Sequence, residues 1–187
     1  LSTVNGDQFT NAAEINIIEK SSEMSVYYVD SEETNSENAP ASKAIDGNVN
    51  SFWHTEYGGG VDPLPHEVQI LLPETVDIKG FTYLPRQDQS NGRIENYEIY
   101  VSTDPDNWGA AVAAGTWGNT PSLKTVNFTP KLGRFFRLVA LSEVSGNQFV
   151  TAAEINVIQS TLGSHETEVI QTKIEAFPIP MPNKLNV

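Results

Sequence analysis

The chain of 187 residues contains 11 Lys and Arg, 24 Asp and Glu and no Cys, and its formal charge at pH 7 is −13. This excess of carboxylates repels phosphate backbones and anionic lipid surfaces, so neither nucleic acid nor membrane lipid is expected as a partner. The lack of Cys excludes disulfides, thiol catalysis and thiolate zinc sites. No apolar run approaches the roughly 20 residues that cross a bilayer as a helix.

The first 20 residues of the chain are similar to a segment near its end. Residues 1–20 align without a gap with residues 141–160, and 12 of the 20 positions are identical. A spacing of 140 residues is too long for a solenoid repeat and matches a whole domain. We therefore expect residues 1–20 to be the terminal strand of a preceding tandem copy and residues 22–160 to be one complete domain. The alternative is that the first segment is a strand of this same domain that resembles the last one.

Short segments with the alternating pattern of β-strands occupy the middle of the chain. After a strand-like piece within residues 21–42, they are HEVQILL, IKGFTYLPR, IENYEIYVSTD, LKTVNFTP, RFFRLVALSEV and AAEINVIQ. His66, in LPHEV, is expected to enter a strand and to make a structural hydrogen bond. Turn residues separate the segments, and no stretch of ten or more residues shows helical periodicity. The pattern predicts an all-β fold, either an antiparallel sandwich or a barrel.

Residues 161–187 differ from the patterned part of the chain. They contain three prolines in FPIPMP, and proline removes the backbone donor that a sheet ladder needs. We expect a linker or the beginning of a following segment here, with TEVIQTKIEAF as one candidate strand.

An oxygen-rich loop, KAIDGNVNSFWHT, follows the first polar stretch. In it Asp46 is followed by Gly47, two asparagines and Ser51. A carboxylate, backbone carbonyls turned inward at a glycine and a hydroxyl form a site for a hard cation such as Ca²⁺. Glu154 of AAEIN is our candidate for a second carboxylate. An ordinary Asp-Gly turn explains the same residues, and the spacing is not that of an EF-hand loop.

The stretches WHTEY and PRQDQSNGR place hydrogen-bonding groups beside aromatic residues. An exposed His54, and Arg86 five residues before Asn91, supply donors and acceptors on loops. Planar polar groups beside an aromatic face are the chemistry that binds sugars. Structural roles compete with this interpretation. Trp53 is expected in the core, and His54 would equally serve as a core or capping histidine. Arg86 and Arg93 would also be explained as solvated surface charges.

No catalytic motif is visible in the chain. It contains no G-x-S-x-G, no H-E-x-x-H and no phosphate-binding loop. Its carboxylates are plentiful, but no recognisable glycosidase pattern frames them. We therefore expect this chain to be no enzyme by itself.

Four ordered motifs resemble the coagulation factor 5/8 type C domain, also called the discoidin domain. They are ASKAIDGNVNSFWHT, PRQDQSNGRIENYEIYVSTDPDNWG, RFFRLVALSEVSG and TAAEINV, and they extend over about three quarters of the chain. Within this family they are most similar to carbohydrate-binding module family 32. The resemblance implies an antiparallel jelly-roll β-sandwich of the galactose-binding-domain type, with about eight core strands and one structural Ca²⁺.

Carried onto this sequence, the resemblance implies a calcium loop at residues 43–51. Asp46 would supply one carboxylate, and Glu154 would close the site with another. The other ligands would be carbonyl oxygens and a hydroxyl, from Lys43, Asn48, Ser51 and Ala153. The AAE phrase would thus join the last strand to an early loop, and Glu14 would have served the preceding copy.

For a sugar, the resemblance implies a His, an Arg and an Asn beside an aromatic platform. The matching residues are His54, Arg86, Asn91 and Phe149, with Tyr57 as a second aromatic candidate. Phe149 stands where a larger ring is common in the family. Few basic residues occur at the expected loop tips, which disfavours a lipid ligand.

Together these expectations describe a non-catalytic carbohydrate-binding module of a secreted, periplasmic or cell-surface bacterial protein. It would hold a linked glycoside hydrolase near glycans with terminal galactose or N-acetylhexosamine, and tandem copies would raise avidity. Two alternatives stay open. One is a protein-interaction or adhesion module without a sugar pocket. The other is a fragment of a protein named as a hydrolase, of hexosaminidase or chitobiase type, whose catalytic domain lies outside this chain.

Overall fold

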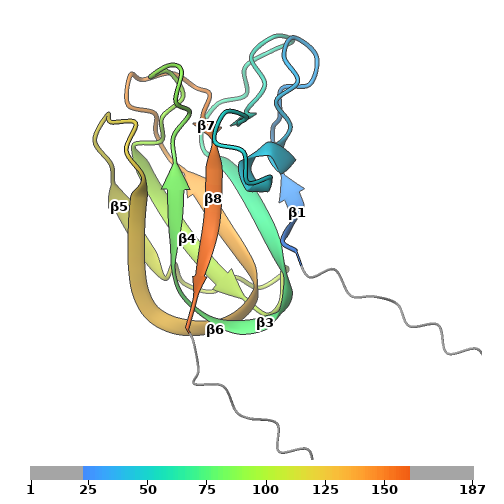
Figure 1. Cartoon of the computed structure of the whole chain (residues 1–187), viewed down its shortest axis with the longest axis vertical. Helices are drawn as coiled ribbons and strands as arrows, with labels where there is room; N and C mark the ends of the chain where they lie inside the picture. Colours follow the sequence, from blue (N-terminus) through green and yellow to red (C-terminus); the bar gives the residue numbers. More distant parts are fainter. Residues whose placement is uncertain (1–22, 161–187) are drawn as a thin grey trace, which may run out of the picture.

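The computed structural model of the chain describes residues 23–160, so the expectations for residues 1–20 and 161–187 lie outside the described residues. Within that range the chain forms eight strands and one short 3₁₀ helix, which confirms the all-β prediction (Figure 1). The elements are β1 (Ser25–Val29), η1 (Ala41–Ile45), β2 (Trp53–His54), β3 (His66–Leu84), β4 (Asn96–Ser102), β5 (Ala113–Thr116), β6 (Lys124–Ala140), β7 (Thr151–Ala152) and β8 (Glu154–Gln159). Among these residues no helix has the length and apolar composition needed to cross a membrane.

Two long antiparallel strands, β3 and β6, hold the sandwich together. They pair from His66↔Ala140 to Tyr83↔Lys124, with irregular register on both sides of Val76. The first half of β3 also pairs with β1, whereas its second half pairs with β8. On the other side of β6 the order continues through β4 to β5. Each long strand therefore bends from one layer of the sandwich into the other (Figure 1).

Several strand boundaries predicted from the sequence are wrong. HEVQILL and most of IKGFTYLPR lie in the single strand β3, and most of LKTVNFTP and the first seven residues of RFFRLVALSEV lie in β6. The prolines and exposed residues between them indicated turns, but they lie at the bends where each strand changes layer. The oxygen-rich loop contains helix η1 and strand β2, and the alanine-rich stretch after residue 110 contains β5.

The core lies between the two layers and consists of alternating strand residues. Trp53 is 1% exposed, as expected, and its Nε1–H donates to the carbonyl of Ser31 (2.9 Å). The other large side chains that are fully buried are Tyr83, Phe81, Phe136, Ile70, Leu72, Ile78, Ile94, Ile99, Leu138 and Ile155. Burial of each such side chain contributes about 1.5–3 kcal/mol to folding. The core therefore supplies a rigid base from which the connecting loops extend.

Strands β2 and β7 join two distant parts of the chain at the loop end of the sandwich. They pair through Trp53↔Ala152 and His54↔Thr151. The Thr55 N–H also donates to the carbonyl of Val150 (3.0 Å). The early loop and the start of the last strand are thereby held side by side.

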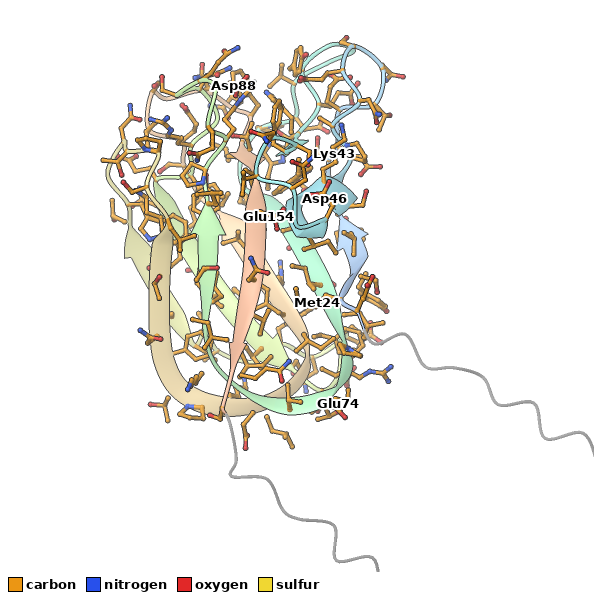
Figure 2. All side chains as sticks on the ribbon, viewed as in Figure 1. Met24, Lys43, Asp46, Glu74, Asp88 and Glu154 are labelled. Carbon is orange, nitrogen blue, oxygen red and sulfur yellow. The ribbon has the colours of Figure 1, made fainter. Side chains whose placement is uncertain are left out.

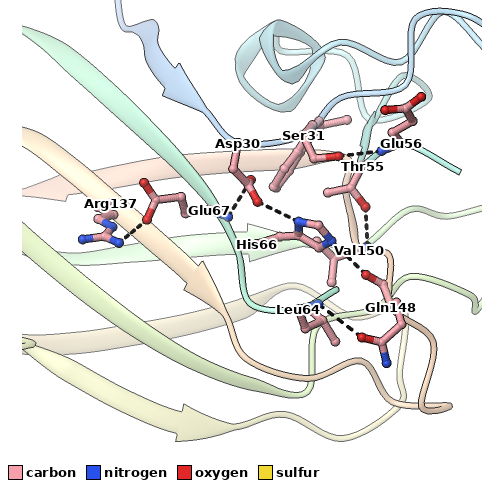
Figure 3. A network of polar contacts seen from close by, with 11 residues as sticks. Asp30, Ser31, Thr55, Glu56, Leu64, His66, Glu67, Arg137, Gln148 and Val150 are labelled. Carbon is pink, nitrogen blue, oxygen red and sulfur yellow. Dashed lines mark hydrogen bonds and ion pairs between the residues drawn. The ribbon is translucent and has the colours of Figure 1, made fainter. Parts of the chain in front are cut away.

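His66 enters β3 as expected and makes structural hydrogen bonds (Figure 3). It is 1% exposed, with Nδ1 2.7 Å from Asp30 Oδ2 and Nε2 2.8 Å from the carbonyl oxygen of Gln148. Both partners are acceptors, so only the protonated ring satisfies both. Burial lowers the pKa of His66, but the hydrogen bond and charge of Asp30 outweigh burial, and the pKa is raised. The imidazolium links the end of β1 to the loop before β7.

We expect the stability of the domain to fall as the pH rises through the raised pKa of His66. The unfolded-state pKa of a histidine is about 6.5, so the contribution of His66 is complete below that pH and is lost above it. Urea unfolding of His66→Gln and wild type between about pH 6 and 9 measures this effect. The variant should show the flatter decline of unfolding free energy. Parallel curves would contradict this role.

Candidate functional site

A cavity of about 290 Å³ opens among the loops at the end of the sandwich that carries β2 and β7. Its lining contains all five residues that the sequence selected for sugar binding, together with two that it did not. They are Glu37, His54, Tyr57, Arg86, Gln89, Asn91 and Phe149. Residues far apart along the chain thus converge in one exposed pocket.

Three rings form one wall of this pocket. The ring centroid of His54 lies 4.6 Å from that of Tyr57 and 5.1 Å from that of Phe149. Tyr57 is 40% exposed and Phe149 is partly buried, so both present ring surface at the opening. Such a wall offers an apolar face on which the C–H groups of a sugar ring can pack.

His54 is buried, not exposed as the sequence suggested, and the rings of Tyr57 and Phe149 pack against it. Its Nδ1 lies 2.6 Å from the carbonyl oxygen of Thr55, which accepts only and therefore assigns the ring proton to Nδ1. Burial is the main cause that lowers the pKa of His54, and the charge of Arg86 lowers it further. The ring is neutral near pH 7, and Nε2 remains as an acceptor.

Arg86 is held by two neighbours and is not a solvated surface charge. It is 5% exposed, and its Nε and Nη2 donate to the two carboxylate oxygens of Asp88, each at 2.8 Å. The guanidinium carbon lies 3.9 Å from the centre of the Phe52 ring. Nη1 is left as the donor group that the Asp88 pair does not use. Arg93 is buried as well, and its Nη1 donates to Asn119 (2.7 Å).

Asn91 carries a polar atom without a partner. Its Oδ1 is buried and has no hydrogen bond within residues 23–160. The backbone next to it is fixed, because the N–H of Gly92 donates to Glu143 Oε1 (2.9 Å) and its carbonyl accepts from the Thr151 N–H (2.7 Å). Gly92 has φ +80°, and a Cβ there would lie 2.6 Å from the Thr151 side chain. Only glycine fits at position 92. The unpaired amide oxygen belongs to Asn91, which lines the cavity, and it indicates a place for a ligand.

Two buried carboxylates that the sequence analysis missed organise the loops around the pocket. Glu33 is 0% exposed and accepts four backbone N–H groups, from Asn35, Ser36, Tyr57 and Gly58. The N–H groups of Ser36 and Tyr57 above all lower the pKa of Glu33 to about 2. Glu143, 2% exposed, similarly accepts from the backbone of three residues: Gly92, Ser145 and Asn147.

Little in the sequence distinguishes these carboxylates from the many surface acids. Asp88 had a local signal, since it follows Arg86 by two residues. The backbone donors of Glu33 and Glu143 come partly from distant loops and appear only in the folded chain.

The predicted cation loop lies beside the last strand, next to the pocket end of the sandwich. Figure 2 shows Lys43, Asp46 and Glu154 close together. The N–H of Asn48 donates to Asp46 Oδ1 (2.8 Å), and the Ser51 hydroxyl donates to Asp46 Oδ2 (2.7 Å). Burial raises the pKa of Asp46, but these hydrogen bonds outweigh it and lower the pKa overall. The structure thus brings the two predicted carboxylates to one place.

Glu154 carries a buried carboxylate oxygen that has no hydrogen-bond partner among the described residues. It is 6% exposed, and its Oε1 is buried without a hydrogen bond from any described residue. Burial raises the pKa of Glu154, and the adjacent Asp46 raises it further. Two carboxylates in contact, one of them with an orphaned oxygen, fit a cation between them.

The neighbouring residues would supply neutral oxygens. Ala153 is fully buried between β7 and β8, and Lys43 lies on η1 with its charge lowering the pKa of Asp46. Within residues 23–160 no group of three or more His, Asp or Glu side chains is arranged so that it could hold a metal ion. A cation at this loop would therefore need carbonyl and hydroxyl oxygens in addition to the two carboxylates, which is the donor set that a hard cation accepts.

Comparison with known proteins places the chain in a family. The F5/8 type C domain model matches residues 18–155. A galactose oxidase of Gibberella zeae is 45% identical over 121 residues, which are 64% of this chain and 18% of that protein. The chain therefore spans about a fifth of the length of this curated relative.

Two solved structures are similar in both fold and sequence. CpGH89CBM32-5 of Clostridium perfringens, in complex with GalNAc-β-1,3-galactose, has a TM-score of 0.66 and 39% identity, covering 72% of this chain and 94% of that one. The family 32 module of C. perfringens NanJ, in complex with galactose, has a TM-score of 0.63 and 36% identity, covering 73% and 93%. The chain belongs to the F5/8 type C domain family, and its structural neighbours are family 32 carbohydrate-binding modules.

Proposed function

We propose that this domain is a non-catalytic carbohydrate-binding module that holds terminal galactose or an N-acetylhexosamine such as N-acetylgalactosamine. The observation that carries the proposal is the convergence of His54, Arg86, Asn91 and aromatic faces in one open pocket. A protein-interaction module would not require planar polar groups and rings gathered in a cavity of sugar size. The complexes of the two neighbours with galactose and GalNAc-β-1,3-galactose support the same ligand class.

Each pocket residue has a distinct role in this proposal. His54 Nε2 accepts a hydrogen bond from one sugar hydroxyl, since Nδ1 is committed to Thr55. Arg86 donates from Nη1 to an axial or ring oxygen, and Asn91 pairs its amide with a neighbouring hydroxyl. The apolar face of the sugar packs on Phe149, with Tyr57 at the rim. These contacts satisfy polar atoms that the protein leaves unpaired.

The domain would act by tethering. A weak module that holds a linked catalytic domain near glycans raises the local substrate concentration, and a second copy would add avidity. We propose a glycoside-processing enzyme as the linked domain, because the curated relative is a sugar-active enzyme much longer than the matched region. The glycans that such an enzyme would process are outside the cell, so the parent protein would be secreted, periplasmic or at the cell surface.

We further propose that the loop at residues 43–51 binds a structural Ca²⁺. Asp46 and Glu154 would supply carboxylates, and the neutral oxygens would come from Lys43, Asn48, Ser51 and Ala153. The orphaned Oε1 of Glu154 supports this assignment. When bound, the ion would neutralise both carboxylates and fasten β8 to the early loop. Its role would be in stability, with no part in chemistry.

Substitution of the pocket residues tests the sugar proposal. His54→Ala and Arg86→Ala should each lower the affinity for methyl β-galactoside at least tenfold, because loss of a buried or charge-assisted hydrogen bond costs about 1.5–3 kcal/mol. Isothermal titration calorimetry measures the affinity, and circular dichroism checks folding. Arg134, which lies on β6 and donates to the Leu72 carbonyl, provides the control Arg134→Ala. Unchanged affinity in both pocket variants would refute the site.

Removal of divalent ions tests the cation proposal. EDTA should lower the melting temperature by several degrees and added Ca²⁺ should restore it, because a ligand at 100 times its Kd stabilises the native state by about 2.7 kcal/mol. Glu154→Gln and Asp46→Asn should abolish the response, whereas Glu74→Gln, at the opposite end of the sandwich, should retain it (Figure 2). If EDTA leaves the melting temperature of the wild type unchanged, the cation proposal is wrong.

The absence of catalysis is also testable. The isolated chain should release no nitrophenol from p-nitrophenyl β-galactoside or N-acetyl-β-galactosaminide, because the pocket presents one carboxylate, Glu37, and a glycosidase needs an opposed pair. Turnover above that of a heat-denatured sample, and sensitive to Glu37→Gln, would contradict the non-catalytic assignment.

A further inference from the structure

The charges around the pocket are unbalanced toward negative. Glu37 and Arg86 line the pocket, Asp88 pairs with Arg86, and Glu33 lies directly behind Tyr57. His54 adds no charge near pH 7, as its buried ring is neutral. With one cation against three anions, the pocket and its immediate wall carry a net charge of about −2 by formal counting.

Asp88 weakens Arg86 as an anion receptor, because it compensates the charge of the guanidinium and uses one of its edges. An unpaired guanidinium at the base of a pocket would offer an incoming carboxylate two parallel hydrogen bonds. Here Asp88 already occupies Nε and Nη2, each at 2.8 Å, and the ring of Phe52 packs against the guanidinium plane at 3.9 Å. What remains is the edge formed by Nη1 and the second N–H of Nη2, with the charge of the guanidinium compensated by Asp88.

Glu37 has no cationic partner among the described residues. None of the ion pairs within residues 23–160 includes it, and its carboxylate accepts a hydrogen bond from the Tyr57 hydroxyl, 3.4 Å from Oε2. Behind it, Glu33 is held ionised by backbone N–H groups. Any ligand in the cavity therefore faces a carboxylate at one wall and a neutralised arginine at the other.

We propose that Glu37 and Asp88 are specificity-determining residues that make the pocket select neutral sugars and exclude anionic ones, such as uronic acids. This inference rests on the proposed function, because it concerns the ligand of the same pocket. A net charge of about −2 located about 7 Å from a ligand carboxylate, in a solvent-like dielectric, disfavours the anion by about five- to tenfold. Glu37 acts by direct repulsion, and Asp88 acts through Arg86 as a positioning and neutralising residue.

A matched pair of ligands separates charge from shape. The methyl β-glycosides of galacturonic acid and of galacturonamide differ by one negative charge and have nearly the same size. Titration at 20 mM salt should show about fivefold or greater preference for the amide, and the preference should shrink in 500 mM salt, where exposed charges are screened. Galactose bound normally, with the amide no better than the acid, would overturn the inference.

Variants test which residues set the preference. Glu37→Gln and Asp88→Asn should each lower the amide-to-acid affinity ratio by about threefold, since each removes one negative charge near the ligand. Glu74→Gln removes the same charge far from the pocket, at the opposite end of the molecule from Asp88, and should leave the ratio unchanged (Figure 2). An unchanged ratio in both pocket variants would refute the assignment of these residues.

Different results would contradict the proposed function and the charge selection. If the wild type binds neither galactose nor N-acetylgalactosamine, the proposed function is wrong. If it binds galactose but prefers the galacturonate, the pocket is a sugar site and the charge selection alone is wrong.

Discussion

The pairing of β2 with β7 is the constraint on which both candidate sites depend. This pairing holds an early loop against the start of the last strand. It joins Trp53 to Ala152 and His54 to Thr151. Trp53 anchors the pair in the core, so the loops on either side are positioned relative to a rigid base. His54 of β2 lines the candidate sugar pocket, and the candidate cation loop at residues 43–51 ends just before β2. A short run near residues 149–154 contributes Phe149 to the first and Glu154 to the second.

Buried carboxylates replace secondary structure as the scaffold of the loops. The loop end has few regular elements, and backbone N–H groups without partners would be costly there. Glu33 and Glu143 accept these N–H groups in clusters, and each joins residues of separate loops. The high acidity of the chain thus has a structural component in addition to its surface component. A Gln at either position would keep the shape but lose half of the acceptor capacity.

The sequence predicted the fold class, and the residues that it selected for each candidate site lie together in the structure, but their burial and hydrogen bonds were not predicted. Alternation in β3, β4 and β6 indicated strands, whereas Pro73 and Pro130 concealed that the long strands are continuous. The resemblance of motifs selected His54, Arg86 and Asn91, which meet in the pocket. Arg86 and Asp88 are two residues apart, so their pairing had a local signal. Burial of His54 and the orphaned amide oxygen of Asn91 depend on contacts between distant segments, so no local pattern could reveal them.

The direction in which the last strand runs has a consequence for how this domain works inside a larger protein. Strand β8 starts beside the loops that form the pocket and ends at the far pole of the sandwich, where residue 160 is the last described (Figure 1). In the proposed tethering role, a segment that continues the chain from residue 160 would leave the domain at the pole opposite the pocket. The domain would then be a spacer as well as an anchor, because the height of the β-sandwich would lie between a held glycan and the point of attachment.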